Sequence, residues 1–247
     1  MKVIAVIPAR WASKRFPGKV LADINGKSMI RRVYEQINKS DIPEQVIVAT
    51  DDERIREHVE QFGGRVVITG PHHRNGTERC NEAAKKIHEE MPVDLVINVQ
   101  GDEPFLDPAM ITQLVSCFHD AKTNIATLIK KIQTSDDLYD PSVVKVVTDQ
   151  SGKALYFSRA AVPWLRNIDQ KEWLQKHCFY KHIGIYAYRS SVLNMISTLK
   201  ATPLELSESL EQLRWLENGF PVMTKITEYE SIGIDTPDDL LKVSKDS

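Results

Sequence analysis

The chain alternates short apolar runs with segments whose apolar residues recur at helical spacing. Apolar runs predict strands at residues 2–8, 45–50, 65–69 and 94–99, and helical spacing predicts helices at residues 28–39, 52–61, 77–90 and 108–120. This alternation is typical of βαβ units and a mostly parallel sheet. Near-continuous apolar runs such as Leu95–Val99 suit strands that are buried on both faces.

The pattern changes after about residue 124. Strands are predicted at residues 124–130, 143–148, 153–158 and 183–188, with few long helices between them. The turn residues Asp149–Gly152 predict a hairpin between the second and third of these strands. A leucine pattern predicts a helix at about 204–218, and Asp235–Asp239 holds an N-cap candidate followed closely by proline, which opens a last helix. We expect one α/β domain over residues 1–247, with a mixed-sheet portion at about 124–230.

Composition and charge exclude several classes of protein. The chain has 247 residues, 42% of them hydrophobic, which is enough for a sizeable core. A formal charge of −2 argues against binding nucleic acid through bulk electrostatics, so an anion site must be local. We expect a cytoplasmic protein without membrane insertion, since no apolar stretch reaches the roughly 20 residues that span a bilayer and nothing at the N-terminus resembles a signal peptide. Cys80, Cys117 and Cys178 lack metal-ligand spacing and indicate reduced thiols.

Polar clusters follow three of the predicted parallel strands. The first is the 8–19 loop, whose cations Arg10, Lys14, Arg15 and Lys19 are interspersed with Ser13 and Gly18; the others are Ala49-Thr50-Asp51 and Gln100–Pro104. Ligands of open α/β sheets bind beyond the carboxyl ends of the strands. A loop of backbone N–H groups and cations there can wrap a polyphosphate. A solvated basic loop remains the alternative explanation of the charges.

Two carboxylates are candidate ligands of a metal ion. Asp102 comes directly after a hydrophobic strand, and Asp235 follows the apolar run Ile232–Ile234. Mg²⁺ usually takes one or two protein carboxylates together with substrate phosphates. Each aspartate has an equally simple alternative role as a cap of the segment that follows it.

The remaining polar motifs leave their roles open. Asn75–Arg79 is a turn running into a helix, with Thr77 or Asn75 as its cap, and Arg79 takes part in a site only if it faces the same sheet edge. Arg159 ends a strand and either clamps a carboxylate or lies in solvent. His182 enters an apolar strand, where a structural role is the commoner one, and His72 and His73 receive no assignment. The P-loop, GxGxxG and G-x-S-x-G motifs are absent from the sequence.

The ordered set of motifs resembles the cytidylyltransferases that activate 3-deoxy-manno-octulosonate (Kdo), an eight-carbon acid sugar of bacterial lipopolysaccharide. The resemblance covers nearly the whole chain. It rests on the motifs at residues 8–10, 17–19, 49–51, 76–79, 98–104, 154–159, 182–186, 210–214 and 235–239. The first motif occurs in many sugar nucleotidyltransferases, whereas the full set is specific to this family.

The resemblance implies a Rossmann-like nucleotidyltransferase fold, with a mixed, mostly parallel central sheet flanked by helices. It implies the Mg²⁺-dependent reaction CTP + Kdo → CMP-Kdo + pyrophosphate in a homodimer, with residues 124–230 serving sugar binding and dimerisation. It places CTP at Pro8, Ala9, Arg10, Ser13, Arg15, Lys19, Ala49, Thr50, Asp51, Gly76 and Arg79. It places the sugar at Gln100, Tyr156, Arg159, His182, Tyr186, Glu211 and Gln212, and Mg²⁺ at Asp102 and Asp235. Arg10, Lys19 and Asp102 would be the catalytic residues.

Three residues or segments depart from the family pattern. Val20 stands where proline commonly follows the lysine, Asn75 stands where serine is common, and Phe179–Lys181 differs from the commonest members. The last departure keeps 8-amino-Kdo as an alternative sugar. Sialic acid, a phosphosugar activated by a different nucleotide, and a non-catalytic nucleotide-binding regulator also stay open. A glycosyltransferase of similar architecture would normally carry Asp-x-Asp, where this chain has Gly101–Pro104.

Overall fold

The computed structural model describes residues 1–12, 16–230, 233–234 and 236–245. Its contacts divide the chain into two compact units. Unit 1 comprises Met1–Thr112, Ala187–Ser197 and Glu230–Ser247, and unit 2 comprises Gln113–Tyr186 and Thr198–Tyr229. The expectation of one domain over residues 1–247 stays a prediction.

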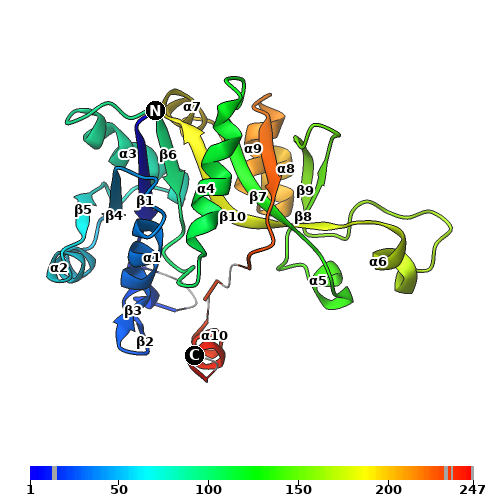
Figure 1. Ribbon diagram of the computed structural model, residues 1–247, viewed down its shortest axis with the longest axis horizontal. Helices are drawn as coiled ribbons and strands as arrows, with labels where there is room; N and C mark the ends of the chain where they lie inside the picture. Colours follow the sequence, from blue (N-terminus) through cyan, green and yellow to red (C-terminus); the bar gives the residue numbers. More distant parts are fainter. Residues whose placement is uncertain (13–15, 231–232, 235, 246–247) are drawn as a thin grey trace. The chain divides into compact units, whose positions relative to one another are not determined.

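Unit 1 is built on a parallel sheet. Its strands β1 (Val3–Pro8), β4 (Gln45–Thr50), β5 (Arg65–Ile68) and β6 (Leu95–Asn98) lie side by side in the order β6-β1-β4-β5 (Figure 1). Residues Val3–Ile7 of β1 are buried, as expected for a central strand with both faces covered. All four carboxyl ends therefore lie along the same edge of this sheet.

Helices of unit 1 pack against this sheet and connect its strands. The helices α1 (Met29–Asn38) and α3 (Gly76–His88) contact β1 and β4, and α2 (Glu53–Gln61) contacts β4 and β5. The unit also contains η1 (Lys19–Leu21), the hairpin of β2 (Asp23–Ile24) and β3 (Lys27–Ser28), α7 (Ser190–Ile196) and α10 (Pro237–Lys245), and α4 (Pro108–Ser116) begins in it.

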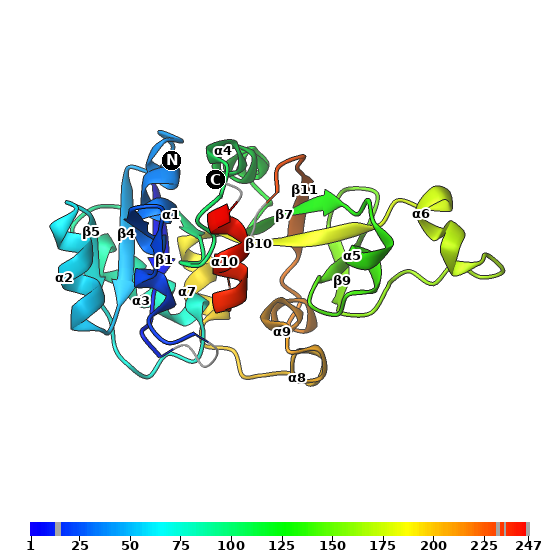
Figure 2. The same cartoon turned by 90° about the horizontal axis from the view of Figure 1, so that it is seen from below.

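Unit 2 combines parallel and antiparallel pairs. The strands β7 (Ile125–Lys131) and β11 (Val222–Ile226) are parallel, and β8 (Lys145–Thr148) and β9 (Ala154–Ser158) form the expected antiparallel hairpin. The long strand β10 (Tyr180–Arg189), drawn in yellow in Figure 2, pairs with β8 through Tyr180 and Lys181, and its last residues from Ala187 on belong to unit 1. The helical segments of unit 2 are η2 (Cys117–His119), α5 (Ser135–Tyr139), η3 (Gln170–Glu172), α6 (Trp173–Lys176), α8 (Pro203–Glu208) and α9 (Glu211–Glu217).

Most expected elements are present within one to three residues of their expected bounds. The predicted fold class, a mixed and mostly parallel sheet flanked by helices, is confirmed. Periodicity missed β11, the two-residue strands β2 and β3, and the short helices α5, α6 and α7. Short elements carry too few residues for a period to stand out.

The helix expected at about 204–218 is wrong as one element. It is two helices, α8 and α9, because Ser209 adopts left-handed backbone angles with φ of 53° and ends α8. Leu210 then occupies the N-cap position of α9. The leucine spacing continued through the break because apolar residues recur on both sides of it, and a serine gives little warning of a left-handed turn.

The last helix begins at Pro237, and the structure assigns its cap to Thr236. The Thr236 hydroxyl accepts a hydrogen bond from the backbone N–H of Asp239 at 3.2 Å, and the Asp239 carboxylate accepts one from the Thr236 N–H at 2.9 Å. This reciprocal pair is a capping box. The other cap candidate, Asp235, lies outside the described residues.

Two further observations bear on the class of protein. Within the part of the chain that the structure describes, every helix is too short or too polar to cross a lipid bilayer. Cys80, Cys117 and Cys178, all within the described residues, form no disulfide bond.

Candidate active site

A small polar pocket lies at the carboxyl edge of the unit 1 sheet. It has a volume of about 100 Å³ and is lined by Pro8, Ala9, Arg10, His73, Asn75, Gly76, Arg79 and Gln100. These residues come from the end of β1, the segment that leads into α3, the start of α3, and the segment after β6. Chain segments far apart in the sequence thus meet at the edge where open α/β sheets bind ligands.

Close backbone packing shapes the wall of this pocket. The Ala9 N–H donates to the Ala49 carbonyl at 2.9 Å, which continues the pairing of β1 with β4 past Pro8. A Cβ atom at Gly76 would lie 3.2 Å from both Pro8 Cγ and Gln100 Nε2. Glycine at position 76 therefore lets the start of α3 approach the end of β1. Any larger residue would push against Pro8 and Gln100.

Arg79 faces the same sheet edge as the pocket, which is the condition for Arg79 to take part in a site there. Its side chain is buried, donates to Thr69 Oγ1 at 2.6 Å, and forms an ion pair with Asp51 Oδ1 at 3.1 Å. Asp51 follows β4, so the ion pair links the polar cluster after β4 to α3. Ala49 and Thr50 are fully buried within β4 and do not line the pocket.

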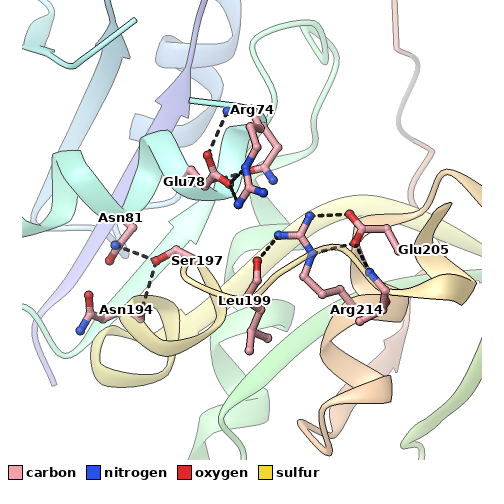
Figure 3. A network of polar contacts seen from close by, with 10 residues as sticks. Arg74, Glu78, Asn81, Asn194, Ser197, Leu199, Glu205 and Arg214 are labelled. Atoms are coloured by element: carbon pink, nitrogen blue, oxygen red, sulfur yellow. Dashed lines mark hydrogen bonds and ion pairs between the residues drawn. The ribbon is translucent and has the colours of Figure 1, made fainter. Parts of the chain in front are cut away.

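The start of α3 is fixed by two hydrogen-bonded pairs. Asn75 is the N-cap, and its side-chain oxygen accepts from the Glu78 N–H at 2.9 Å. Arg74 donates to Glu78 through its backbone N–H at 2.9 Å and its Nε at 2.7 Å (Figure 3). Together these bonds set the orientation of the helix end that borders the pocket.

Lys19 and Asp102 form a close ion pair in unit 1. Lys19 Nζ lies 2.5 Å from Asp102 Oδ2 and 3.4 Å from the Ile234 carbonyl oxygen. The Ile234 N–H in turn donates to the Asp102 carbonyl at 2.9 Å. The side chains of Lys19 and Asp102 are 12% and 26% exposed, so both charges are accessible to a ligand.

Gly18 brings Lys19 to this position through a backbone conformation that favours glycine. Its φ is 69°, and a Cβ atom there would lie 2.8 Å from the Trp11 ring. Its N–H donates to the Trp11 carbonyl at 2.9 Å, which closes the basic loop onto itself. Arg10 is exposed at the other end of this loop, while Ser13 and Arg15 lie outside the described residues.

The donor set at Asp102 fits a magnesium ion. The carboxylate is partly exposed, Lys19 occupies its Oδ2, and an oxygen ligand of this kind is what Mg²⁺ prefers. The second expected ligand, Asp235, lies outside the described residues. Its neighbour Ile234 is hydrogen-bonded to Asp102 and to Lys19.

His182 and Tyr186, two of the residues expected to surround the sugar, lie together on β10 in unit 2. Their ring centroids are 5.1 Å apart, and His182 also meets Phe157 edge-on at 5.3 Å. His182 Nε2 lies 3.0 Å from Thr127 Oγ1. Burial lowers the pKa of His182 to about 3, so the imidazole is neutral near pH 7. A neutral ring can serve as a hydrogen-bond partner for a sugar hydroxyl.

The helix α9 carries Glu211 and Gln212, two more of the residues expected to surround the sugar. Burial, assisted by the Glu211 carboxylate, raises the pKa of Tyr186 well above its ordinary value. Tyr186 also packs edge-on against Trp215 of α9, with 5.0 Å between ring centroids. Gln212 is buried in the same helix. The structure therefore brings His182, Tyr186 and Glu211 together, whereas Gln100 belongs to unit 1 and lines the pocket described above.

Glu208 is a residue that sequence reasoning missed. Its carboxylate accepts hydrogen bonds from Ser158 Oγ at 2.7 Å, the Arg159 N–H at 2.9 Å and Tyr156 Oη at 3.4 Å. Burial would raise the pKa of Glu208, but these bonds hold it below its usual value. The end of β9, which carries Tyr156 and Arg159, is thereby fastened to the end of α8. The sequence carries no signal for it, because residues 204–218 predict one helix and a glutamate is ordinary inside a helix.

The Arg159 guanidinium is held by backbone carbonyls. It donates from Nε to Glu208 O at 2.7 Å, from Nη1 to Pro141 O at 2.9 Å and from Nη2 to Ser209 O at 3.5 Å. An arginine oriented in this way by carbonyls keeps its full positive charge. Its position at a strand end is therefore fixed by tertiary contacts and is not that of a freely solvated arginine.

The fold and the pocket together define the class of protein as a nucleotidyltransferase. A family model described as cytidylyltransferase matches residues 4–232. A 3-deoxy-manno-octulosonate cytidylyltransferase from Parabacteroides distasonis is 54% identical over 246 residues, which cover 98% of this chain and 96% of the relative. The chain therefore belongs to the cytidylyltransferase family, in the branch of the 3-deoxy-manno-octulosonate cytidylyltransferases, and the expected family is confirmed.

Solved structures agree with this assignment. The structure of CMP:2-keto-3-deoxy-manno-octonic acid synthetase complexed with CTP superposes with a TM-score of 0.90 at 40% identity, covering 99% of this chain and 98% of that one. A 4-diphosphocytidyl-2C-methyl-D-erythritol synthase from Anaerococcus prevotii has a TM-score of 0.61 at 14% identity, covering 99% and 97%. The second likeness concerns the fold alone.

Proposed function

We propose that this chain transfers the cytidylyl group of CTP to Kdo, giving CMP-Kdo and pyrophosphate. The anomeric hydroxyl oxygen of Kdo forms a bond to the α-phosphorus while the bond from that phosphorus to the bridging oxygen of pyrophosphate breaks, and the hydroxyl proton is released. Such a displacement needs little covalent help from protein side chains. Positioning of the reactants and neutralisation of phosphate charge supply most of the rate.

The observation that carries the proposal is the pocket at the carboxyl edge of the unit 1 sheet. Arg10 lines it from the segment after β1, and Gly76 and Arg79 line it from α3; all three are CTP-binding positions expected from the family resemblance. A polar pocket with two arginines suits an anionic nucleotide better than an apolar ligand. We assign CTP binding to this pocket and to the neighbouring basic loop.

Lys19 and Arg10 would neutralise charge on the phosphates. Lys19 is paired with Asp102 at 2.5 Å, so each charge compensates the other. When nucleotide binds, the lysine transfers to a phosphate oxygen and the carboxylate becomes available to a cation. The ion pair therefore keeps two site charges oriented until their ligands arrive.

Mg²⁺ is the cation that we assign to Asp102, with Asp235 as a second candidate ligand. Bound there, it would supply positive charge to the triphosphate and orient it. The residues of this chain hold the remaining roles: Arg10 and Lys19 orient the leaving phosphates, and Asp102 retains the ion.

Unit 2 would supply the sugar site. Arg159 offers a positive charge to the sugar carboxylate, and the neutral His182 with Tyr186 offers hydroxyl contacts. Tyr156, Glu211 and Gln212 complete the proposed set within unit 2, whereas Gln100, which the family resemblance also implies, belongs to unit 1. Because the Arg159 guanidinium already donates to three carbonyls, a carboxylate would have to replace part of that set.

The test is a pyrophosphate-release assay that crosses the four ribonucleoside triphosphates with Kdo, 8-amino-Kdo and sialic acid. We expect the highest kcat/KM with CTP and Kdo. Faster turnover of 8-amino-Kdo or sialic acid would transfer the assignment to that sugar. Nucleotide binding without pyrophosphate release from any pair would contradict the enzymatic assignment and favour a regulator.

We further propose a cellular setting that follows from the family. The product, CMP-Kdo, would feed lipopolysaccharide synthesis from the cytoplasm, and the enzyme would act as a homodimer. The resemblance in sequence supports these three statements.

A further inference from the structure

A cluster of nitrogen and oxygen ligands lies in unit 1 beside the pocket assigned to CTP, with which it shares His73. His72 and His73 belong to the segment between β5 and α3, and Glu82 lies in the second turn of α3. Their ligand atoms all lie within 4.8 Å of one another. We propose that His72, His73 and Glu82 form a binding site for one zinc ion or a similar divalent transition metal.

The existing hydrogen bonds already hold two of the three ligands in place. His73 Nε2 lies 2.6 Å from Glu82 Oε2, which also accepts from the Gly70 N–H at 3.0 Å. The other carboxylate oxygen, Oε1, pairs with Lys86 Nζ at 2.8 Å. The carboxylate is therefore oriented from both sides, with one oxygen turned towards the imidazole.

The backbone at Gly70 allows the third ligand to join them. A Cβ atom at position 70 would lie only 2.4 Å from Cε1 and 2.7 Å from Nδ1 of His72. The His72 ring thus folds back over the glycine, and its centroid lies 4.6 Å from that of His73. A hydrogen bond from His73 to Glu82 would by itself fasten the segment to α3, but it does not explain why His72 lies beside them.

The ligand set favours zinc over the magnesium of the proposed reaction. Two imidazole nitrogens with one carboxylate oxygen are typical of zinc sites that keep a fourth position for water, whereas Mg²⁺ and Ca²⁺ prefer oxygen ligands throughout. The ion would replace the proton between His73 Nε2 and Glu82 Oε2. With bonds of about 2.0–2.2 Å, tetrahedral ligand atoms lie roughly 3.3 Å apart. The exposed His72 can adjust its side chain to complete that geometry.

Metal binding would tie the segment that borders the nucleotide pocket to α3. His73 is a member of both groups, because it also lines the pocket of about 100 Å³ with Arg10 and Arg79. An ion on His73 would therefore fix one wall of that pocket. The metal site itself does not depend on the proposed reaction.

The proposal is tested by cobalt and zinc binding to tag-free, chelator-treated protein at pH 7.5. We expect one equivalent of Co²⁺ to give the intense visible absorption of a tetrahedral site and one equivalent of Zn²⁺ to displace it. Each of His72→Ala, His73→Ala and Glu82→Gln should weaken zinc binding by about tenfold or more, measured against a chromophoric chelator. His119→Ala, which removes an exposed histidine of unit 2, is the matched control and should bind as the parent does.

Three results would overturn the proposal. They are the absence of a one-to-one cobalt complex, equal zinc affinity in all three variants, and an unchanged affinity in His72→Ala alone. His72 is exposed, so its replacement keeps the fold and the last result remains decisive if the other variants unfold. Because the readout is metal binding, failure here leaves the pyrophosphate-release test unaffected.

Discussion

At the scale of single residues, Lys19 and Asp102 hold two opposite charges together as an ion pair in the proposed site. Neither charge is buried enough to need a partner for folding alone, with side chains 12% and 26% exposed. Gly18 in a left-handed conformation and the backbone bond from Ile234 to Asp102 fix the two ends of the pair. Partly exposed ion pairs contribute only about 0–1 kcal/mol to stability, which agrees with the role proposed for both charges in binding ligands.

Replacement of Asp102 by asparagine should abolish turnover and leave the fold intact. The amide keeps the size and one hydrogen-bond acceptor of the side chain but loses the charge that retains a cation. We expect kcat to fall by at least about 100-fold, with the melting temperature unchanged within a few degrees. Lys19→Ala should cause a comparable loss. Release of pyrophosphate at near the parent rate by either variant would remove that residue from the proposed machinery.

His182 provides a test that depends on pH. Because burial lowers its folded pKa to about 3 from 6.5, the ring should remain neutral, and its Cε1–H resonance should not titrate between pH 5 and 8. The unfolded chain takes up this proton below about pH 6.5 and the folded chain does not, so stability falls as pH decreases from there towards 3. We expect a loss of roughly 1–2 kcal/mol between pH 6.5 and 5 from this group.

Urea titrations of the parent and of His182→Gln measure that contribution. The variant should lose less stability than the parent over the same interval. A resonance assigned to His182 that titrates near pH 6.5 would contradict the buried, neutral imidazole.

At the scale of elements, the sugar site depends on how β9, α8 and α9 are fastened to one another. Ser209 ends α8 in a left-handed conformation, and Glu208 beside it binds the end of β9. The Glu205 carboxylate binds Arg214 of α9, with Nε at 2.7 Å, and Arg214 Nη1 donates to the Leu199 carbonyl at 3.0 Å (Figure 3). Two glutamates of one short helix thus set the positions of a strand and of a second helix.

Glu208→Ala should weaken binding of the sugar more than binding of CTP. Loss of the carboxylate frees Ser158 Oγ and the Arg159 N–H, so the end of β9 that carries the Arg159 guanidinium is held less firmly, although the carbonyls that bind the guanidinium remain. We expect KM for the sugar to rise by about tenfold, the equivalent of one charge-assisted hydrogen bond, with KM for CTP unchanged. Glu228→Ala, at an exposed position of the same unit, is the control. An equal rise in both KM values would contradict a positioning role.

Glu205→Ala should destabilise the protein. Arg214 is buried, with only 4% of its side chain exposed, and the variant would remove the Glu205 carboxylate that pairs with it. Breaking a buried pair from one side costs about 3–5 kcal/mol. Urea-induced unfolding should show a loss of that order. A change below about 1 kcal/mol would mean that water or the Leu199 carbonyl compensates the guanidinium.

At the scale of the whole molecule, the proposed nucleotide-binding residues and most of the proposed sugar-binding residues belong to different compact units. Unit 1 holds the pocket and the Lys19–Asp102 pair, and unit 2 holds six of the seven residues expected to surround the sugar, the exception being Gln100. Parallel βαβ packing buries β1, β4 and β6 of unit 1, whereas the edge strand β5 is partly exposed.

The expected homodimer is tested by mass in solution. Light scattering coupled to size-exclusion chromatography should give twice the 28.1 kDa mass of the chain at micromolar concentration. A mass equal to one chain across the concentration range would contradict the homodimer and leave the catalytic assignment to the kinetic tests.

Periodicity in the sequence determined the elements that are long and bury one consistent face. The strands β1, β4 and β6 and the helices α1, α2 and α3 follow directly from apolar spacing, since burial of those residues drives both folding and pattern. The family motifs likewise predict the site residues, because phosphate and carboxylate recognition requires specific charged groups at strand ends, and their roles stay predictions.

Tertiary structure alone decided the remaining points, because they depend on contacts between residues far apart in the sequence. Arg79 became a pocket residue only through its bonds to Asp51 and Thr69. Glu208 acquired a role only because α8 ends beside β9, and the helix expected at 204–218 broke at a serine whose left-handed angles are held by its surroundings. Hydrophobic spacing records which face of a segment is buried, whereas the partner of a polar side chain is set by the path of the folded chain.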